Sequence, residues 1–472
     1  MADATAAVRA PGSAERAAEQ GHSGESLEAK LQRVGDPVRM LRDSPSGRFK
    51  SPYPDQYTTW QDEQEAWRTT AVLFDQSHHM TDVYFEGPDV QRLLSDTGTN
   101  SFEGFGRDRA KHFIACAEDG NMIGSAVLFG LEKEQASLVG PAAAANWVQF
   151  QAETGGYDVD IVRDERTRDQ RGGNRRLFRF EIEGPATWTI LERANGGSVP
   201  RVPFFRMTEF RIGEVPVRAL SHTMAGVPGA ESMGMEIFGP ASEGARCWDA
   251  LLEAGEEFGL LRGGMLAYYT GAIESGYAAQ PTPAIYDAPS LQPYRQWLPA
   301  DGYEGGLSVG GSFRSPDIRD YYTTPFDFGY GHLVKFDHDF IGRTALEDAA
   351  ARPHRRKVWL RWNDADVSRV YASSLFGGVH RAKFLDTPLA RYARVMLDTV
   401  ELDGRFVGVS TMTGYTVNIG AWASIAFLDD DAAVDGAEVT VTWGEENGGT
   451  SKLTVERHEQ TKVRTVVSTQ PL

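Results

Sequence analysis

The chain has 472 residues, 41% of them apolar, and a formal net charge of −18. A chain of this length can bury a large core and should divide into two or three domains, with a cleft between domains as the expected place for a ligand. The excess of negative charge would repel nucleic acid and anionic lipid, so we expect neither of them as a partner.

The cysteine content and hydropathy predict where the protein works. The two cysteines, Cys116 and Cys247, lack any paired spacing, which is typical of proteins in the reducing cytosol. No apolar run approaches the ~20 residues of a membrane-spanning helix, and the first residues lack the apolar core of a signal peptide. We therefore expect a soluble, cytoplasmic protein that is a monomer or a small homo-oligomer, without membrane contact.

The first half of the chain reads as a mixture of helices and strands. Residues 1–26 are small, polar and charged without periodicity, which predicts a disordered tail. Apolar residues at helical spacing predict helices over 27–43 and 63–74. Alternating apolar and polar residues predict strands over 82–86 and 176–183.

The second half of the chain turns from helix to strand. The charged stretch 163–176 is predicted to be a solvated loop, and 244–260 an amphipathic helix with Gly259 in its C-terminal region. At Pro353 a helix ends, and a strand is predicted over 357–362. Four later segments of alternating residues predict a small antiparallel barrel or sandwich: RFVGVSTMTG (405–414), WASIAFLD (422–429), EVTVTW (438–443) and KLTVERH (452–458).

These elements indicate an α+β fold rather than a regular doubly wound sheet, because strands and helices alternate irregularly. We expect three parts along the chain. A disordered tail covers residues 1–26, a region with two subdomains covers 27–352, and a C-terminal β-barrel domain covers 353–472.

Two adjacent histidines precede a predicted strand in the segment FDQSHHM (74–80). Neighbouring residues of an extended chain point to opposite faces, and no H-x-x-x-H or C-x-x-C motif lies nearby, so we expect no metal site. His78 is expected to pack or cap, whereas Gln76 and His79 are candidates for the polar wall of a cleft. The sequence contains neither a G-x-S-x-G elbow nor a P-loop, which argues against hydrolase and NTPase functions.

The order of several motifs resembles that of the aminomethyltransferase (glycine cleavage T-protein) superfamily. The resemblance extends from about residue 30 to the end of the chain. It is carried by LFDQSHHMTDVYFEGPDV, MAGVPGAESMGMEIFGP, AIESGY, VKFDHDFIGRTAL and VGVSTMTGYTVNIGAWASIAFL. It implies a folate-binding aminomethyltransferase (T-protein-like) fold with a C-terminal antiparallel β-barrel.

Within this superfamily the chain resembles most the tetrahydrofolate-dependent aromatic O-demethylases, the group that acts on vanillate, 3-O-methylgallate and syringate. The shared segments include MLRDS, LEAGEEFGL, PAIY and WGEENGGT. This resemblance implies transfer of a methyl group from a methoxylated aromatic compound to N5 of tetrahydrofolate, which gives 5-methyltetrahydrofolate and a phenol. Tetrahydrofolate is then a co-substrate, and no metal is implied.

The resemblance assigns the folate contacts to particular residues. The pterin of tetrahydrofolate presents two adjacent N–H donors, which one buried carboxylate can accept in parallel. By motif match that carboxylate is Glu236 in GMEIFG, where the apolar flanks predict a buried strand; the alternative is a surface Glu beside a turn. Glu183 and Tyr277 are further candidates for folate contacts.

A phenolate leaving group calls for a proton donor of similar pKa, about 10, and a tyrosine hydroxyl matches it. Tyr268 in LAYYTGAIESG stands where the O-demethylases carry such a tyrosine, so we expect it to be catalytic and to touch folate; a packed core tyrosine is the alternative. Tyr269 would face elsewhere if this segment is extended. The expected substrate contacts are Gln76, His79, Phe49 and Ser125.

Two departures from the family patterns bear on the substrate. T-proteins carry a pair of aspartates where this chain has Gly124 and Ser125, so glycine cleavage is not expected. Vanillate-type members carry an Arg where this chain has Pro141, so the carboxylate of vanillate would lose a bidentate partner. The ring then lacks a carboxylate or directs it toward another cation, such as Arg48 or Lys50.

Several alternatives stay open on sequence alone. The basic stretch 352–357 could meet the folate glutamate tail or be a solvated linker, and WGEENGGT could be a turn using Gly448 and Gly449 or a segment that closes over the site. The alternatives for function are a folate-dependent demethylase of an N- or S-methyl compound and a non-catalytic folate-binding protein. Spacing predicts neither the ether that is cleaved nor a polyglutamate preference.

Overall fold

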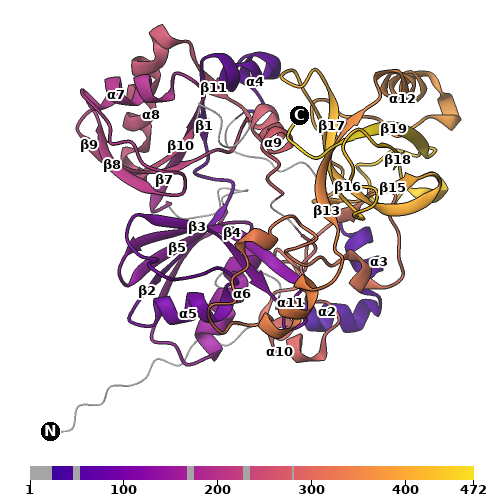
Figure 1. Ribbon diagram of the computed structural model, residues 1–472, viewed down its shortest axis with the longest axis horizontal. Coiled ribbons are helices and arrows are strands. Elements are labelled where there is room, and N and C mark those ends of the chain that lie inside the picture. Colours follow the sequence, from indigo (N-terminus) through magenta and orange to yellow (C-terminus); the bar gives the residue numbers. More distant parts are fainter. Residues whose placement is uncertain (1–23, 46–53, 167–174, 227–233, 279–280) are drawn as a thin grey trace.

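Two helix-covered sheets and a closed barrel make up the fold (Figure 1). The computed structural model describes residues 24–45, 54–166, 175–226, 234–278 and 281–472. The first sheet has the strand order β11 (Leu260–Gly263), β1 (Ala71–Asp75), β7 (Leu177–Glu183), β10 (Gly234–Pro240), β9 (Val215–His222) and β8 (Met207–Ile212). The second has the order β3 (Arg109–Cys116), β4 (Met122–Glu132), β5 (Gln135–Gly140), β2 (Thr81–Glu86) and β6 (Asp160–Asp164).

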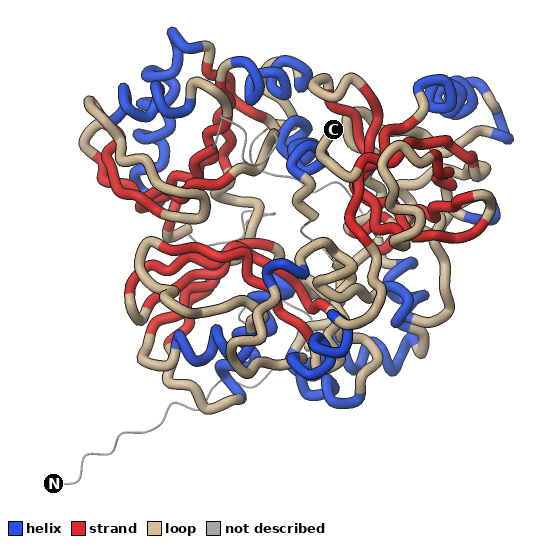
Figure 2. The backbone as a smooth tube through the Cα atoms, in the orientation of Figure 1, coloured by secondary structure: helices blue, strands red, loops and turns tan. Residues whose placement is uncertain are grey.

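Each sheet is covered by helices on one face and meets the other sheet with its second face (Figures 1 and 2). Contacts across the gap include the rings of Phe129 on β4 and Phe238 on β10, whose centroids lie 5.6 Å apart. The two inner faces therefore form a layer that burial keeps away from water. The outer faces are packed by α7 (Thr187–Asn195) and α8 (Gly244–Gly255) on the first sheet, and by α6 (Ala142–Thr154) on the second, with α5 (Val90–Thr97) packed against α6.

The N-terminal helix predicted over 27–43 is two helices, α2 (Leu27–Val34) and α3 (Pro37–Asp43). Gly35 ends the first with φ +74°, a conformation that favours glycine. Asp36 caps the second by accepting from the Arg39 amide, and Pro37 occupies its first position. Of the predicted tail, only residues 24–26 lie in the described part, and Ser26 caps α2 there.

The helix predicted over 63–74 is wrong in its second half. The helix α4 (Trp60–Thr69) ends before Thr70, and the apolar run that follows is strand β1, in the interior of the first sheet. Its residues pair with β11 in parallel and with β7 in antiparallel orientation. A strand covered on both faces is apolar at every position, so its sequence lacks the alternation that would have identified it.

The predicted helix over 244–260 also ends early. α8 stops at Gly255, and Gly259 with φ +72° turns the chain so that Leu260 begins β11. The stretch 163–176 is not wholly a solvated loop: Asp164 ends β6, and Arg175 is buried, donating to the Glu165 carbonyl at 2.8 Å. Residues 167–174 lie outside the described residues.

The predicted C-terminal barrel is confirmed. It closes in the order β13 (Arg356–Trp362), β17 (Ala421–Leu428), β16 (Arg405–Thr416), β15 (Asp398–Leu402), β18 (Glu438–Trp443) and β19 (Thr461–Ser468), with α12 (Asp364–Phe376) beside it. The strand predicted over 452–458 is wrong: this segment is a loop, with Leu453 exposed and Lys452 donating to the Ser44 carbonyl at 3.0 Å. The last strand is β19 instead.

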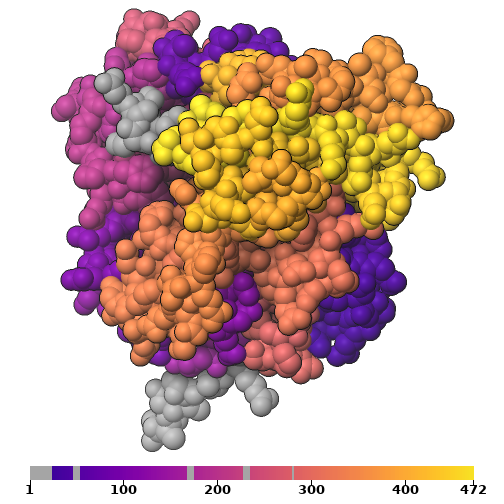
Figure 3. Space-filling view, turned by 45° about the vertical axis from the view of Figure 1, so that its right-hand side comes forward, coloured from indigo at the N-terminus to yellow at the C-terminus, as the bar shows by residue number. Residues whose placement is uncertain are grey.

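One helix, α9 (Met265–Ser275), joins the sheet region to the barrel (Figure 1). It packs against α4 and against β16 and β17 of the barrel. The remaining helices are α10 (Gln292–Trp297) and α11 (Arg343–Ala350), and a short parallel pair, β12 (Val309–Gly310) and β14 (Val395–Met396), links the region between them to the C-terminal part. Figure 3 shows the barrel packed directly on the remainder of the molecule. Among the described helices, none is long and apolar enough to cross a membrane.

Candidate functional site

A network of charges lies between the two sheets and joins them. The guanidinium of Arg179 on β7 donates from Nε to Asp82 on β2 at 2.9 Å and from a terminal nitrogen to Glu236 on β10 at 2.7 Å. The rings of Phe129 and Phe238 lie 4.7 and 5.1 Å from the same guanidinium. Since all three charged groups are almost fully buried, each depends on the others for its ionised state.

Glu236 is the carboxylate on which the predicted folate contact rests. It stands in a buried strand, as the flanking residues predicted, and is 3% exposed. Burial alone would raise its pKa, but the Arg179 guanidinium and His222 outweigh burial and lower the pKa to about 2. Glu236 is therefore ionised at neutral pH.

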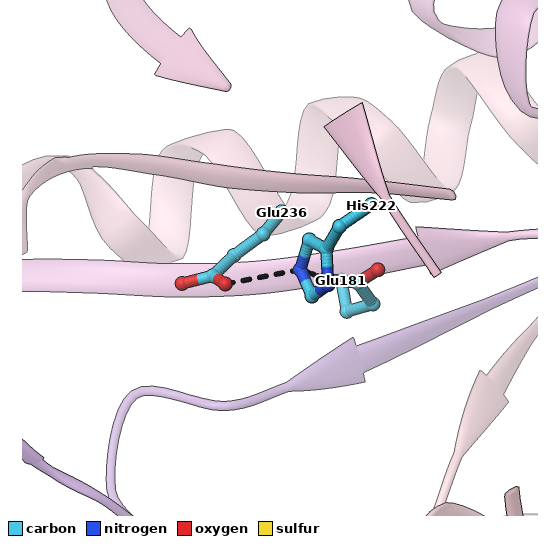
Figure 4. Close-up of side chains that lie close together, drawn as sticks. All are labelled: Glu181, His222 and Glu236. Atoms are coloured by element: carbon cyan, nitrogen blue, oxygen red, sulfur yellow. Dashed lines mark ion pairs between the residues drawn. The ribbon is translucent and has the colours of Figure 1, made fainter. Parts of the chain in front are cut away.

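His222 lies between two carboxylates, as Figure 4 shows. Its Nε2 is 2.9 Å from a Glu181 oxygen and 3.1 Å from a Glu236 oxygen, although the alignment is too oblique for a regular hydrogen bond to either. Burial opposes the charged imidazolium, but the two carboxylates raise the pKa of His222 well above its usual value. The ring is thus held as a cation and forms ion pairs with both acids.

Within the described residues, these three side chains also form the one group whose donor atoms lie close enough together to hold a metal ion. Their ligand atoms, from Glu181, His222 and Glu236, lie within 4.8 Å of one another. A divalent ion would have to displace the proton of His222 and would sit beside the Arg179 cation, which already pairs with Glu236. The absence of a resident metal, expected from sequence, stays a prediction.

Tyr268 and His79 form a second pair at the site. The Tyr268 hydroxyl lies 2.8 Å from His79 Nε2, and His79 Nδ1 lies 3.0 Å from the Gln76 carbonyl oxygen. Burial lowers the pKa of His79 to about 3, so the ring is neutral. A carbonyl oxygen only accepts, so Nδ1 carries the hydrogen and Nε2 is the acceptor. The Tyr268 hydroxyl therefore donates to His79.

The segment that carries Tyr268 is helical, so the condition under which Tyr269 would face elsewhere, an extended chain, is not met. It belongs to α9, and the Tyr269 ring lies 5.4 Å from the Tyr268 ring. Tyr269 therefore stays beside the site, although it does not point the same way. Aromatic neighbours of Tyr268 also include Phe74 at 5.3 Å.

The two other described substrate candidates are buried polar side chains. Gln76 is 3% exposed, and its amide nitrogen has no hydrogen-bond partner among the described residues. Ser125 on β4 is likewise buried, with a hydroxyl that is unpartnered in this part of the chain. It lies on the same face of β4 as Phe129, which packs toward Arg179, so it faces the layer between the sheets. Both side chains are available to a polar ligand.

The two further folate candidates differ in their surroundings. Burial and, secondly, the charge of Glu236 raise the pKa of Tyr277 to about 12, so its hydroxyl stays protonated in the field of that carboxylate. Glu183 instead accepts from the Ala225 amide at 3.3 Å and from the Met224 amide, and burial with nearby Glu181 raises its pKa well above the usual value. Its contacts hold the turn after β9, and a direct folate contact stays a prediction.

Among the remaining candidates, Pro141 and the basic stretch lie in the described residues. Phe49, with Arg48 and Lys50, lies outside the described residues. Pro141 precedes α6, at the end of β5. In the basic stretch, Arg352 is exposed, whereas Lys357 donates to the Gly276 carbonyl at 2.9 Å.

The WGEENGGT segment is a turn, with φ +84° at Gly448 and +140° at Gly449, as predicted. Its continuation packs against the end of α3, where Ser451 donates to Asp43 at 2.7 Å.

Sequence reasoning missed Arg179, His222 and Asp82 as members of the site. One signal was present: RLFRFEIE places Arg179, Glu181 and Glu183 at alternate positions of a predicted strand, so their side chains share one face. Charged residues on one face beside an apolar other face indicate either exposure or a buried network. The sequence does not separate these two cases, because the partners come from strands far along the chain.

Comparison with known proteins agrees with this architecture. The family model of the GCVT N-terminal domain matches residues 47–282. A syringate O-demethylase from Sphingobium sp. is 41% identical over 94% of this chain and 96% of its own length. A sesamin methylene transferase from Sinomonas sp. is 29% identical over 76% of this chain and 78% of its own length.

Among solved structures, the glycine cleavage system aminomethyltransferase T of Bartonella henselae covers 92% of this chain and 96% of its own, with a TM-score of 0.58 and 17% identity. At that identity the likeness supports the fold alone. The match to the syringate O-demethylase carries more, because it combines 41% identity with nearly complete coverage of both chains. The chain therefore belongs to the GCVT aminomethyltransferase family, and within it to the group of the aromatic O-demethylases.

Proposed function

We propose that the protein is a tetrahydrofolate-dependent O-demethylase, which moves the methyl group of a methoxylated aromatic compound to N5 of tetrahydrofolate. The similarity to a syringate O-demethylase over nearly the whole chain supports this function. One observation carries this proposal: the molecule holds both a buried, ionised Glu236 and a buried hydrogen bond between Tyr268 and His79. These two groups match the two ends of the reaction, binding the pterin and protonating the phenolate.

Glu236 would hold the pterin. Ionised and buried, it accepts the two N–H groups of the pyrimidine edge, and such charge-assisted bonds gain strength in a site without water. Arg179 and the His222 cation keep this carboxylate charged and fix its orientation. Tyr277, whose hydroxyl stays protonated near Glu236, adds a donor to the same end of the pterin.

Tyr268 would act on the ether. The carbon–oxygen bond breaks as the bond from carbon to N5 forms. The Tyr268 hydroxyl turns from His79 and gives its proton to the phenolate oxygen, and the proton that N5 loses restores the hydroxyl. A tyrosine hydroxyl suits the proton transfer to the phenolate because its pKa resembles that of the product phenol. His79, neutral and with its acceptor nitrogen on the hydroxyl, holds Tyr268 in place, and Gln76 and Ser125 offer polar contacts to the ring substituents.

The first experiment identifies the reaction products. Purified protein with tetrahydrofolate and syringate, vanillate, methoxybenzoates, guaiacols or the corresponding aldehydes should give 5-methyltetrahydrofolate and a phenol in equal amounts. Chromatography of both products against standards measures this. No product from any methoxyarene, with turnover of an N- or S-methyl compound instead, would move the assignment to that class.

The second experiment isolates the proton donor. Tyr268→Phe keeps the ring and removes the hydroxyl, so turnover should fall by about 10²- to 10⁴-fold with folate binding kept. Tyr371→Phe, a half-buried tyrosine of the barrel domain, is the matched control and should leave turnover unchanged. Full activity of Tyr268→Phe would remove Tyr268 from the mechanism.

A further inference from the structure

Three arginines from two separate parts of the chain gather near Tyr269, the residue after Tyr268. Arg166 follows β6, and Arg391 and Arg394 precede β14 in the C-terminal part. A terminal nitrogen of Arg391 donates to the Arg394 carbonyl at 3.2 Å, which ties the second and third together. In a protein with a net charge of −18, such a local excess of positive charge needs a physical reason.

Two tyrosines stand among these arginines. The Arg391 guanidinium lies 5.6 Å from the Tyr269 ring centre, and the Arg394 guanidinium lies 4.6 Å from the Tyr303 ring centre. Burial raises the pKa of Tyr269, and Arg166 is near enough to oppose this rise. Tyr269 directly follows Tyr268 on α9, with their rings 5.4 Å apart. The ring of Tyr269 therefore lies between the arginine cluster and Tyr268, the proposed proton donor.

The positive charges act on one another. Burial, followed by the charges of Arg394 and Arg391, lowers the pKa of Arg166 to about 10, although Tyr269 opposes the shift. Among the described residues, Arg394 has no carboxylate within ion-pair distance. Glu304, next to Tyr303, is already occupied, because both of its oxygens accept from Asn146 at 2.9 Å. An anion entering the cluster would relieve this repulsion.

We propose that Arg166, Arg391 and Arg394, with the hydroxyls of Tyr269 and Tyr303, form a carboxylate-binding subsite for the acid group of the aromatic substrate. This inference rests on the proposed function, and it names the substrate class as methoxylated aromatic acids. It also explains how the chain could bind a ring carboxylate although Pro141 replaces the arginine of vanillate-type members. The cations come instead from the C-terminal part and from the residues after β6.

The short distance between Tyr268 and the arginine cluster favours a carboxylate on the aromatic ring over the glutamate tail of folate as the ligand of the arginines. A ring that presents its methoxy group to Tyr268 would place its acid group about one ring away, where the arginines lie. The glutamate carboxylates of folate are separated from N5 by a methylene, an amine, a benzoyl ring and an amide. A folate tail at the arginines would therefore leave the reacting nitrogen far from Tyr268.

The test uses a pair of ligands that differ only in charge, syringate and its carboxamide. The wild-type protein should prefer syringate in kcat/KM. In Arg394→Met, the kcat/KM for syringate should fall about 10- to 100-fold, while the value for the carboxamide stays within about twofold. Arg391→Met should behave alike, and Arg394→Lys, which keeps the charge without the fork, should lose less. Equal losses for acid and amide would overturn the proposal.

Two controls separate the ring carboxylate from a general loss of positive charge and from the carboxylates of folate. Arg381→Met removes an exposed arginine from the same segment and should change neither ligand. Tetrahydropteroate lacks the glutamate of tetrahydrofolate; if Arg394→Met weakens the binding of tetrahydrofolate but not of tetrahydropteroate, the carboxylate belongs to folate and the proposal is wrong.

A direct binding measurement separates this inference from the proposed function. Calorimetry with syringate and the carboxamide needs no turnover, so it reports on the subsite even if no methoxyarene is demethylated. Tighter binding of the acid to the wild type, lost in Arg394→Met, would support the subsite alone. No preference for the acid in the wild type would reject it.

Discussion

His79 and His222 are both fully enclosed, yet their neighbours give them opposite charges. His79 has a carbonyl at one nitrogen and a hydroxyl at the other, and a neutral ring satisfies both. His222 has a carboxylate near each side of Nε2, and only an imidazolium compensates those charges. Burial depresses the pKa of both rings, so the identity of the contacting oxygens decides which one is charged.

The charge states of these two rings can be observed directly. We expect neither ring to titrate between about pH 5 and 8, His79 staying neutral and His222 staying protonated, whereas an unperturbed histidine changes at about 6.5. NMR spectra of protein with labelled histidine measure this, and His79→Gln and His222→Gln assign the two signals. A midpoint near the unperturbed value for either ring would contradict these charge states.

The same pKa shift has a consequence for stability. Because the folded-state pKa of His222 is raised above its unfolded value of about 6.5, its contribution is fully present below that pH and is lost as pH rises through the folded pKa. The contribution of Glu236 runs the other way. Its pKa is lowered to about 2, so its contribution is present above about pH 4.3 and is lost as pH falls toward 2.

Replacing Glu236 by glutamine tests the folate contact. Glu236→Gln removes the negative charge and presents an NH₂ group to a pterin edge that offers donors, so the Kd for tetrahydrofolate should rise about 10- to 100-fold. A fluorescence titration measures it. Glu253→Gln, on the exposed face of α8, is the control and should leave the Kd unchanged. An unchanged Kd in Glu236→Gln would remove this residue from the folate site.

At the scale of single elements, α9 depends on α4 for its first turn. Gly264 precedes α9 and has no side chain to cap it, and a Cβ there would lie 2.4 Å from the Asp55 carbonyl oxygen. The buried carboxylate of Glu63 on α4 accepts from the Gly264 amide at 2.8 Å, and from the amides of Tyr57 at 2.6 Å and Thr58 at 2.9 Å. A negative charge at this end also suits the helix dipole.

Glu63→Gln should therefore loosen the helix that carries Tyr268. The amide keeps the volume but loses the charge and one acceptor, so a backbone donor is left unsatisfied and the free energy of unfolding should fall by about 1–3 kcal/mol. The value of kcat should fall more than KM changes, because Tyr268 is displaced rather than removed. Urea unfolding and steady-state kinetics measure the two effects, and an unchanged kcat would show that the carboxylate does not position Tyr268.

The elements that could be predicted from sequence are those with a clear local signal. Alternation identifies β2, β7 and β18, and Pro353 identifies the end of α11. The residues of β1 are predicted as helix because a strand buried on both faces has no alternation. The segment 452–458 alternates like a strand but is a loop held by Lys452.

The residues of the candidate site likewise fall into those that a local segment indicated and those that it did not. Glu236 and Tyr268 were proposed from sequence because each stands in a segment that resembles the family's, and their roles stay predictions. Arg179, His222 and the three arginines of the carboxylate subsite were missed, because strand register and the packing of the C-terminal part bring them together. Asp82 and Arg179 are in contact although they are 97 positions apart in sequence, and no local pattern encodes such a contact.

At the scale of the whole molecule, the barrel holds α9 from the side opposite the sheets. The indole Nε1 of Trp359 on β13 donates to the Ile273 carbonyl at 2.7 Å. Gly276, which ends α9 with φ +69°, lies so close that a Cβ would stand 2.3 Å from the Trp359 ring. Asn418 of the barrel also donates to Glu274 at 3.1 Å. The barrel domain is therefore part of what positions Tyr268, in addition to supplying Arg391 and Arg394.

Two tryptophans of β13 allow this coupling to be measured. Trp359→Phe leaves the Ile273 carbonyl without its donor at the end of α9. Trp362→Phe removes one of the two donors to the Ser424 hydroxyl inside the barrel, where Ser410 still donates. Both rings are buried and each loses one hydrogen bond, so both variants should lower the free energy of unfolding by about 1–3 kcal/mol.

Only Trp359→Phe should also lower kcat, because only Trp359 touches the helix that carries Tyr268. Denaturant unfolding gives the two stabilities, and initial rates at saturating tetrahydrofolate give the two values of kcat. If both variants lose the same fraction of kcat, the loss reflects stability alone, and the barrel would then be a folding partner without influence on the geometry of the site.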